Sequence, residues 1–186
     1  VDPDPFDTST RTQPLKLYIT PPAAEIVRAE AEIIAVNRMQ FYEKVVIDVD
    51  NGVAGTTGNI GTYGNPVDNL TDAVTIANDY GFSTLEILTR MTLDSGTNID
   101  GFNIVGASMA NTRSYMDENA QCANINIRNC AISGVLDGGV VINTCVVGDL
   151  EYVYGHIHHS GLAGTLYLNG QADAVITDCY TVDFDN

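Results

Sequence analysis

The stretch INIRNCAI, residues 125–132, decides the fold because the chain returns to the same pattern three more times. The later copies are VVINTCVV (140–147), GHIHHSGL (155–162) and AVITDCYT (174–181). In each copy an isoleucine stands three places before a cysteine or serine, and the steps between successive isoleucines are 15, 15 and 19. Self-similarity at a near-constant period predicts a solenoid, in which each repeat buries its apolar face against its neighbours.

The period is too short for helical repeats, and it fits a coil of short strands joined by tight corners. Further apolar runs lie between the copies, and glycines stand where corners are expected, at 138, 139, 148, 164 and 170. The predicted fold class is therefore mainly β: a right-handed, single-stranded parallel β-helix. An extended arm, a short oligomerising helix and a helix that caps the β-helix are expected before it.

Two columns of inward side chains are expected to fill the coils, because like residues stack on one another from coil to coil. The first is an aliphatic column of Ile127, Ile142, Ile157 and Ile176. The second is a column of small groups, Cys130, Cys145, Ser160 and Cys179. Buried cysteine behaves as a small hydrophobe, so free thiols are predicted, with two disulfides among the four cysteines as the alternative.

Three segments are expected along the chain. Residues 1–21 hold four prolines and form an extended arm, or else a disordered terminus. Residues 22–52 hold an oligomerisation helix and a strand, and residues 53–186 form the β-helix domain. The first helix carries apolar residues on a 3-4-3 spacing, at Ile26, Ala29, Ile33 and Val36. A helix of this length is marginal alone in water, so its stripe predicts a homotrimer, with packing on the chain's own core as the alternative.

A second helix is predicted over 69–80 as the cap of the β-helix. Asn69 is a good N-cap residue, Asp72 follows it three places later, and Gly81 ends the helix. Only one face of this helix is apolar, so it is expected to cover an apolar surface on one side.

Charge and hydropathy exclude several partners. The chain has 8 basic and 24 acidic residues, a formal net charge of -16, which would repel nucleic acid and anionic membrane surfaces. No apolar run approaches the roughly eighteen residues that a membrane-spanning helix needs, and no stretch of signal-peptide type opens the chain. We therefore expect neither nucleic-acid binding nor membrane insertion.

The histidines around residue 157 are the most specific candidate for a metal site. Strand alternation places His156 and His158 on one face, and two imidazoles on one face are able to hold a metal ion. The sequence identifies no third ligand, so surface polar residues are the favoured interpretation, and no cofactor is predicted. The turn Asp48-x-Asp50-Asn51-Gly52 lacks the glutamate that ends a calcium-binding EF-hand loop, which favours a plain turn.

The order of these pieces resembles that of phage virion proteins with a pectin-lyase-like β-helix, over residues 55–186 and most clearly at PVDNLTDA (66–73). The resemblance implies a homotrimer that is made in the host cytoplasm and attached to the virion through its N-terminal arm. A structural role as head fibre or capsid decoration is favoured. The alternatives are a receptor-binding tail fibre or tailspike, with a host surface glycan as partner, and a bacterial surface adhesin.

Proteins of this resemblance often cleave polysaccharides, and glycoside hydrolysis needs two carboxylates about 5 to 9.5 Å apart. The acidic residues that could serve are Asp137, Asp149, Glu151, Asp173, Asp178 and Asp183. Acidic residues are expected at the outward corners of a β-helix in a chain this acidic. The prediction is therefore that the protein is not an enzyme and has no catalytic residues.

Overall fold

The computed structural model describes residues 25–28, 32, 39–94, 96–117, 122, 124–136, 138–142, 144–168 and 174–181. They belong to two compact units, 1–34 and 35–186. In the first unit, residues 25–28 and 32 are helical, and Arg28 Nε donates to Glu32 Oε1 at 3.2 Å. Ile26 is exposed in this unit. The other predicted oligomerisation residues, Ala29, Ile33 and Val36, and the arm 1–21 lie outside the described residues.

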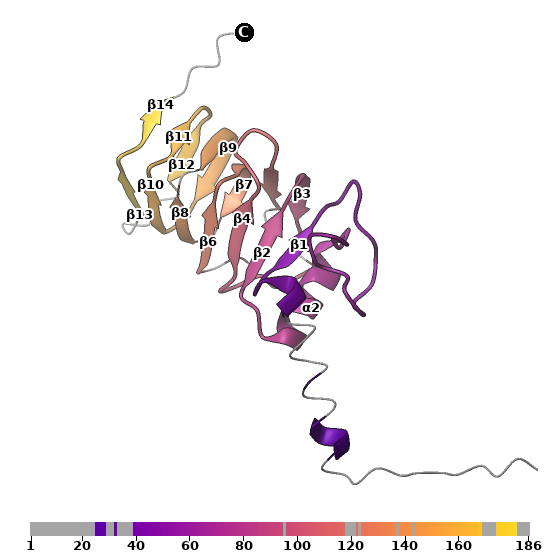
Figure 1. The fold of residues 1–186 in the computed structure, drawn as a ribbon. Helices are drawn as coiled ribbons and strands as arrows, with labels where there is room; N and C mark the ends of the chain where they lie inside the picture. Colours follow the sequence, from indigo (N-terminus) through magenta and orange to yellow (C-terminus); the bar gives the residue numbers. More distant parts are fainter. Residues whose placement is uncertain are drawn as a thin grey trace, which may run out of the picture. The chain divides into compact units, whose positions relative to one another are not determined.

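The second unit is a parallel β-solenoid whose coils follow one another in chain order (Figure 1). One sheet has the order β1 (Val45–Ile47), β2 (Thr84–Ile87), β4 (Asn103–Gly106), β6 (Ile125–Arg128), β8 (Gly139–Ile142), β10 (Gly155–His158) and β13 (Ala174–Thr177). The other has the order β3 (Arg90–Leu93), β5 (Arg113–Met116), β7 (Ala131–Leu136), β9 (Cys145–Tyr152), β11 (Gly161–Leu162) and β14 (Tyr180–Thr181). In addition β12 (Leu166–Leu168) pairs with β9.

One column of aliphatic side chains runs through the whole first sheet. Cα pairing links, in order, Val45, Leu85, Ile104, Ile127, Val141, Ile157 and Ile176. The first six are fully buried, and the sequence steps between successive members from Leu85 onward are 19, 23, 14, 16 and 19. A parallel solenoid therefore tolerates coils of unequal length, because corners absorb the difference while strands keep their register.

The prediction that Ile142 belongs to this column is wrong, because Val141 occupies the place between Ile127 and Ile157. Ile142 instead pairs with Arg128 and His158 on the outward face and is only half-buried. The corner before β8 makes this coil one residue shorter than the alignment required. Since side chains alternate along a strand, a shift of one residue moves every side chain to the opposite face.

The same shift changes the column of small groups. Cys145 pairs with Ala131 and with Gly161, the residues that follow Cys130 and Ser160, so its predicted place in that column is wrong. Thr144 takes that position, and its backbone N–H donates to Ser160 Oγ at 3.3 Å.

The corner after each strand of the first sheet uses a left-handed backbone conformation at three described positions. Asn129, His159 and Asp178 directly follow β6, β10 and β13, and their φ angles are 61°, 50° and 53°. Asparagine, aspartate and histidine adopt this conformation more readily than other side-chain-bearing residues. The corner sequence therefore allows the chain to turn from the first sheet into the second.

The N-terminal end of the solenoid combines β1 with α2 (Leu70–Tyr80). Val45 pairs with Leu85 although the glycine-rich loop and α2 separate them in sequence, so this strand, assigned from sequence to the oligomerisation segment, begins the first sheet. The Asn69 side chain accepts the Asp72 N–H at 2.8 Å, and Gly81 ends the helix at a φ of 70°. The buried face of α2 packs against β1 and β2.

The last coil differs from the others in its exposure. Ile157 is fully buried, whereas its partner Ile176 on β13 is 38% exposed.

Within the interior, Tyr152 is also fully buried, and its hydroxyl donates to the Gly139 carbonyl at 2.8 Å. The single polar group of this side chain is thereby satisfied inside the apolar core.

Candidate functional site

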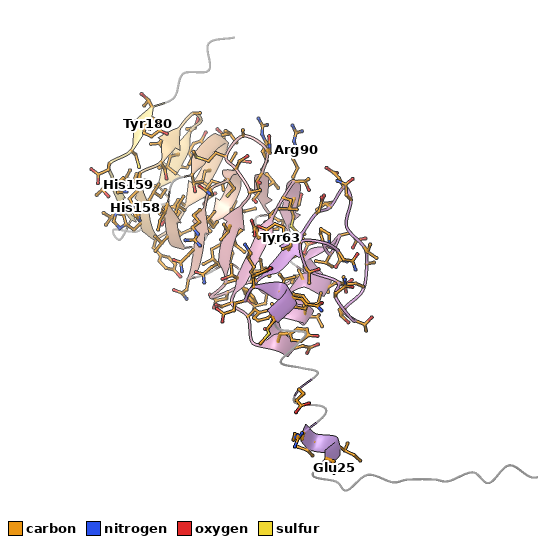
Figure 2. All side chains as sticks on the ribbon, in the orientation of Figure 1. Glu25, Tyr63, Arg90, His158, His159 and Tyr180 are labelled. Carbon is orange, nitrogen blue, oxygen red and sulfur yellow. The ribbon has the colours of Figure 1, made fainter. Side chains whose placement is uncertain are left out.

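The rings of His156, His158 and His159 lie close together at β10 and the corner that follows it, and Figure 2 shows His158 and His159 side by side there. His156 and His158 project from β10 on either side of the buried Ile157, and their ring centroids are 4.8 Å apart. His159 Nδ1 lies 2.9 Å from His158 Nδ1, and His159 Nε2 lies 4.0 Å from Asp178 Oδ2. The corner conformation of His159 thus turns its ring toward His158.

The ring nitrogens of these histidines contact neighbouring side chains and do not converge on a shared metal position. His156 Nε2 is 2.8 Å from Thr177 Oγ1, and the two Nδ1 atoms of His158 and His159 share one hydrogen. Within the part of the chain that the structure describes, no group of three or more His, Cys, Asp or Glu side chains is placed to hold a metal ion. His156 and His158 therefore offer imidazole nitrogens without a third protein ligand among the described residues.

A second polar cluster joins Lys44, Tyr63 and Glu86 at the N-terminal end of the first sheet. Lys44 Nζ lies 2.5 Å from Glu86 Oε2 and donates to the Tyr63 hydroxyl at 3.2 Å. The Tyr63 hydroxyl in turn donates to Glu86 Oε1, and Lys44 Nζ lies 4.7 Å from the centre of the Tyr63 ring. Glu86 is buried, and its two carboxylate oxygens are bound by these two partners.

The hydrogen bonds of this cluster favour the protonated forms of Lys44 and Tyr63. The hydrogen bond to Glu86 raises the pKa of the Lys44 ammonium above its usual value. Burial, together with the hydrogen bond to Glu86, raises the pKa of the Tyr63 hydroxyl. Neither group is therefore a base or a nucleophile near neutral pH. The hydrogen bond from Tyr63 to Glu86 joins the glycine-rich loop to β2.

The turn after β1 is closed by its own chain. Asp48 Oδ1 accepts the backbone N–H groups of Asp50 and Asn51, each at 3.1 Å, and Asp48 itself is buried. Asn51 Nδ2 also donates to this carboxylate, at 3.2 Å from Oδ2. The Asp48 carboxylate is thus occupied by hydrogen bonds within the turn, which agrees with a plain turn.

The described cysteine side chains are structural. Cys122 and Cys130 are buried, Cys179 is half-buried, and the thiols of Cys130 and Cys179 are free. Burial raises the pKa of the Cys130 thiol to about 12, which keeps it in the unreactive protonated form. The side chain of Cys145 lies outside the described part of the structure.

Among the acidic residues that might act as a carboxylate pair, two of the described ones, Asp149 and Glu151, share a hollow, and the others do not join them. Asp137, Asp173 and Asp183 lie outside the described residues. Asp149 and Glu151 line an open hollow of about 390 Å³ beside Tyr115 and Tyr167 on the second sheet. Asp178 lies elsewhere, at the histidine corner.

A hollow with a volume of about 820 Å³ lies on the outer face of the second sheet. Its floor is formed by outward residues of β3, β5 and β7, and one wall is formed by the N-terminal end of α2. Arg90 and Arg113 are Cα partners on β3 and β5, and both are exposed. Thr92, Tyr115 and Ser133 form the next outward column, two places along the strands.

Sequence reasoning missed both the Arg90–Arg113 pair and the Lys44 cluster. The step in sequence from Arg90 to Arg113 equals the step from Ile104 to Ile127 in the next stretch of the solenoid. This spacing was not recognisable because the first coils carry no copy of the 125–132 pattern. Lys44, Tyr63 and Glu86 come from three unrelated segments, and nothing local links them.

The fold and these surfaces define a parallel β-solenoid with a hollow on its second sheet. Comparison with known proteins found no match: neither a protein-family model, nor a curated protein, nor a solved structure resembles the chain significantly. The described part of the chain contains no helix with the length and apolar character needed to span a membrane.

Proposed function

We propose that the chain is a structural virion protein of a bacteriophage, a homotrimeric β-solenoid that projects from or coats the particle as a head fibre or capsid decoration. The observation that carries the proposal is the aliphatic column from Val45 to Ile176, which gives a stiff rod with a continuous interior. The biological setting comes from the sequence alone, because the order of segments over residues 55–186 resembles that of phage virion proteins.

The chemistry of the described residues supports a structural role. The Lys44 ammonium and the Tyr63 hydroxyl are both bound to Glu86, and burial raises the pKa of the Cys130 thiol to about 12. Each therefore stabilises the coils rather than offering a reactive group. The interaction partners in this proposal are other copies of the chain and, through the arm 1–21, other virion proteins.

The trimer rests on the helix in residues 22–40. Ile26 is exposed in the described part of this helix, as expected of an apolar residue that packs against another copy of the chain. The mass of the full chain in solution, measured by light scattering, should be three times 19.9 kDa. Ile26→Asp and Ile33→Asp should give monomers, whereas Arg28→Asp, on another face, should leave the trimer intact.

A monomeric wild-type chain, or a trimer that survives both isoleucine substitutions, would contradict the bundle. Location is tested separately, by electron microscopy of intact phage particles labelled with an antibody against the solenoid. Label on the capsid supports a head fibre or decoration protein, and label on the tail supports a tail fibre. Particles without label would overturn the virion assignment.

A further inference from the structure

We infer that the hollow on the second sheet is a binding site for an oligosaccharide that carries a carboxylate, with Arg90 and Arg113 as the residues that hold the acid group. The inference concerns the surface of a single solenoid and does not depend on the trimer or on the virion. It begins from the placement of positive charge. From position 41 to the end of the sequence the basic residues are Lys44, Arg90, Arg113 and Arg128.

Two of these four residues stand directly opposite one another. Arg90 and Arg113 are Cα partners in parallel register, on strands about 4.8 Å apart. Like charges at directly opposite positions destabilise a sheet. Neither guanidinium group forms an ion pair or hydrogen bond with another described residue, although acidic residues outnumber basic ones three to one in this chain. An arrangement that costs stability and lacks a partner among the described residues indicates an anionic ligand.

The hollow limits how much negative charge that ligand carries. Asp68 and Asp94 also line it, so its charged side chains sum to zero before a ligand arrives. The carboxylate of Asp94 accepts the Gly96 N–H at 3.0 Å, and that of Asp68 accepts from Asn69 Nδ2 at 2.7 Å. A densely charged polymer would be repelled by these carboxylates and by the net charge of -16, whereas one carboxylate fits between two guanidinium groups.

The rest of the lining favours a sugar over an acidic peptide. Beside the arginines the floor presents the Thr92 and Ser133 hydroxyls and the side chain of Tyr115, a residue that is 52% exposed. Hydroxyl groups exchange hydrogen bonds with sugar hydroxyls, and an exposed aromatic face packs on the apolar face of a pyranose ring. A smaller hollow shares Tyr115 and continues to Tyr167, also exposed, so the surface accommodates an extended ligand.

Figure 2 shows the Arg90 side chain projecting away from the coils, where a ligand in solution can reach it. A carboxylate accepts hydrogen bonds from two guanidinium groups at once, and each charge-assisted pair is stronger than a neutral hydrogen bond. The arginines therefore supply affinity and selection for acid, while Tyr115 and the hydroxyls position the adjoining sugar.

The test uses isothermal titration of the full chain with three probes. They are a hyaluronan tetrasaccharide, which alternates glucuronate with a neutral sugar, the neutral, fully N-acetylated chitotetraose, and tetraglutamate. The hyaluronan tetrasaccharide should bind most tightly, and its affinity should fall with added salt. Arg90→Gln with Arg113→Gln should weaken binding by about tenfold for each arginine removed. Arg128→Gln is the matched control, because it removes the same charge from the outer face of the first sheet and should leave binding unchanged.

Stability separates a binding role from a structural one. Because the two arginines oppose each other without described partners, Arg113→Gln should leave the urea unfolding midpoint unchanged or raise it. Failure of the tetrasaccharide to bind, unchanged binding by the double variant, or equal binding of chitotetraose would overturn the inference. Tighter binding of tetraglutamate would replace the sugar with an acidic peptide and would equally overturn it.

Discussion

Alanine at Val141 and, separately, at Ile142 distinguishes the observed register from the register that the sequence pattern suggested. Val141→Ala removes two carbon atoms from a fully buried position. At about 0.8 kcal/mol per carbon the transfer cost is about 1.6 kcal/mol, and the cavity left behind raises it to about 2–3 kcal/mol. Ile142→Ala removes three carbon atoms, but from a half-buried, outward side chain, so the expected cost is about 1 kcal/mol.

The two free energies of unfolding are measured by urea titration, followed by circular dichroism at a strand wavelength because the chain has no tryptophan. The substitution that removes fewer atoms should cause the larger loss. If Ile142 occupied the interior, its substitution would cost about 2–5 kcal/mol. A larger loss at Ile142 than at Val141 would therefore refute the observed register.

Three further predictions concern a corner, a helix cap and a thiol. Gly155 has a φ of 117°, and an added Cβ would lie 2.0 Å from the Gly139 carbonyl oxygen. Gly155→Ala should therefore destabilise the solenoid by about 2 kcal/mol or more. An unchanged thermal midpoint of unfolding would contradict this packing. The side chain of Asn69 and the Gly55 N–H lower the pKa of Asp72 below 3.8, so the contribution of the Asp72 carboxylate to stability is present above pH 3.8 and is lost as the pH falls through the lowered value. The difference in free energy of unfolding between wild type and Asp72→Asn should therefore shrink on acidification. A pH-independent difference would rule the contribution out. Cys130 should resist iodoacetamide at pH 8 until urea unfolds the chain, and rapid labelling of the native protein, detected by peptide mass, would show that its burial is incorrect.

The solenoid itself is predictable from sequence because its evidence is repetitive. Four copies of one pattern, with isoleucine three places before a small side chain, predict stacked coils of short strands. The bounds of α2 are also predictable, because Asn69 and Gly81 act through local backbone geometry that neighbouring residues determine.

The register of β8 is not predictable in the same way. Val140, Val141 and Ile142 are three consecutive β-branched residues, so the local pattern fits the interior at either parity. Only the length of the corner before β8 decides between them, and the two adjacent glycines that stand there carry no hydrophobic signal.

Long separations hide the remaining features. Val45 pairs with Leu85, although the stretch of chain between them includes α2. Local periodicity therefore does not identify β1 as the first strand of the sheet. The Arg90–Arg113 pair depends on a coil that is longer than the period of the later copies. The candidate binding surface therefore emerges only when strand register is known, since single arginines in sequence give no sign of their neighbours.

The most direct test of the parallel register is disulfide formation between paired outward positions. Arg128 and Ile142 are Cα partners on β6 and β8, so Arg128→Cys with Ile142→Cys should form an intramolecular disulfide on oxidation, detected by peptide mass without reduction. The pair Asn126→Cys with Val141→Cys, which only the register shifted by one residue would bring together, should stay reduced. A disulfide in the second pair and none in the first would contradict the stacked coils described above.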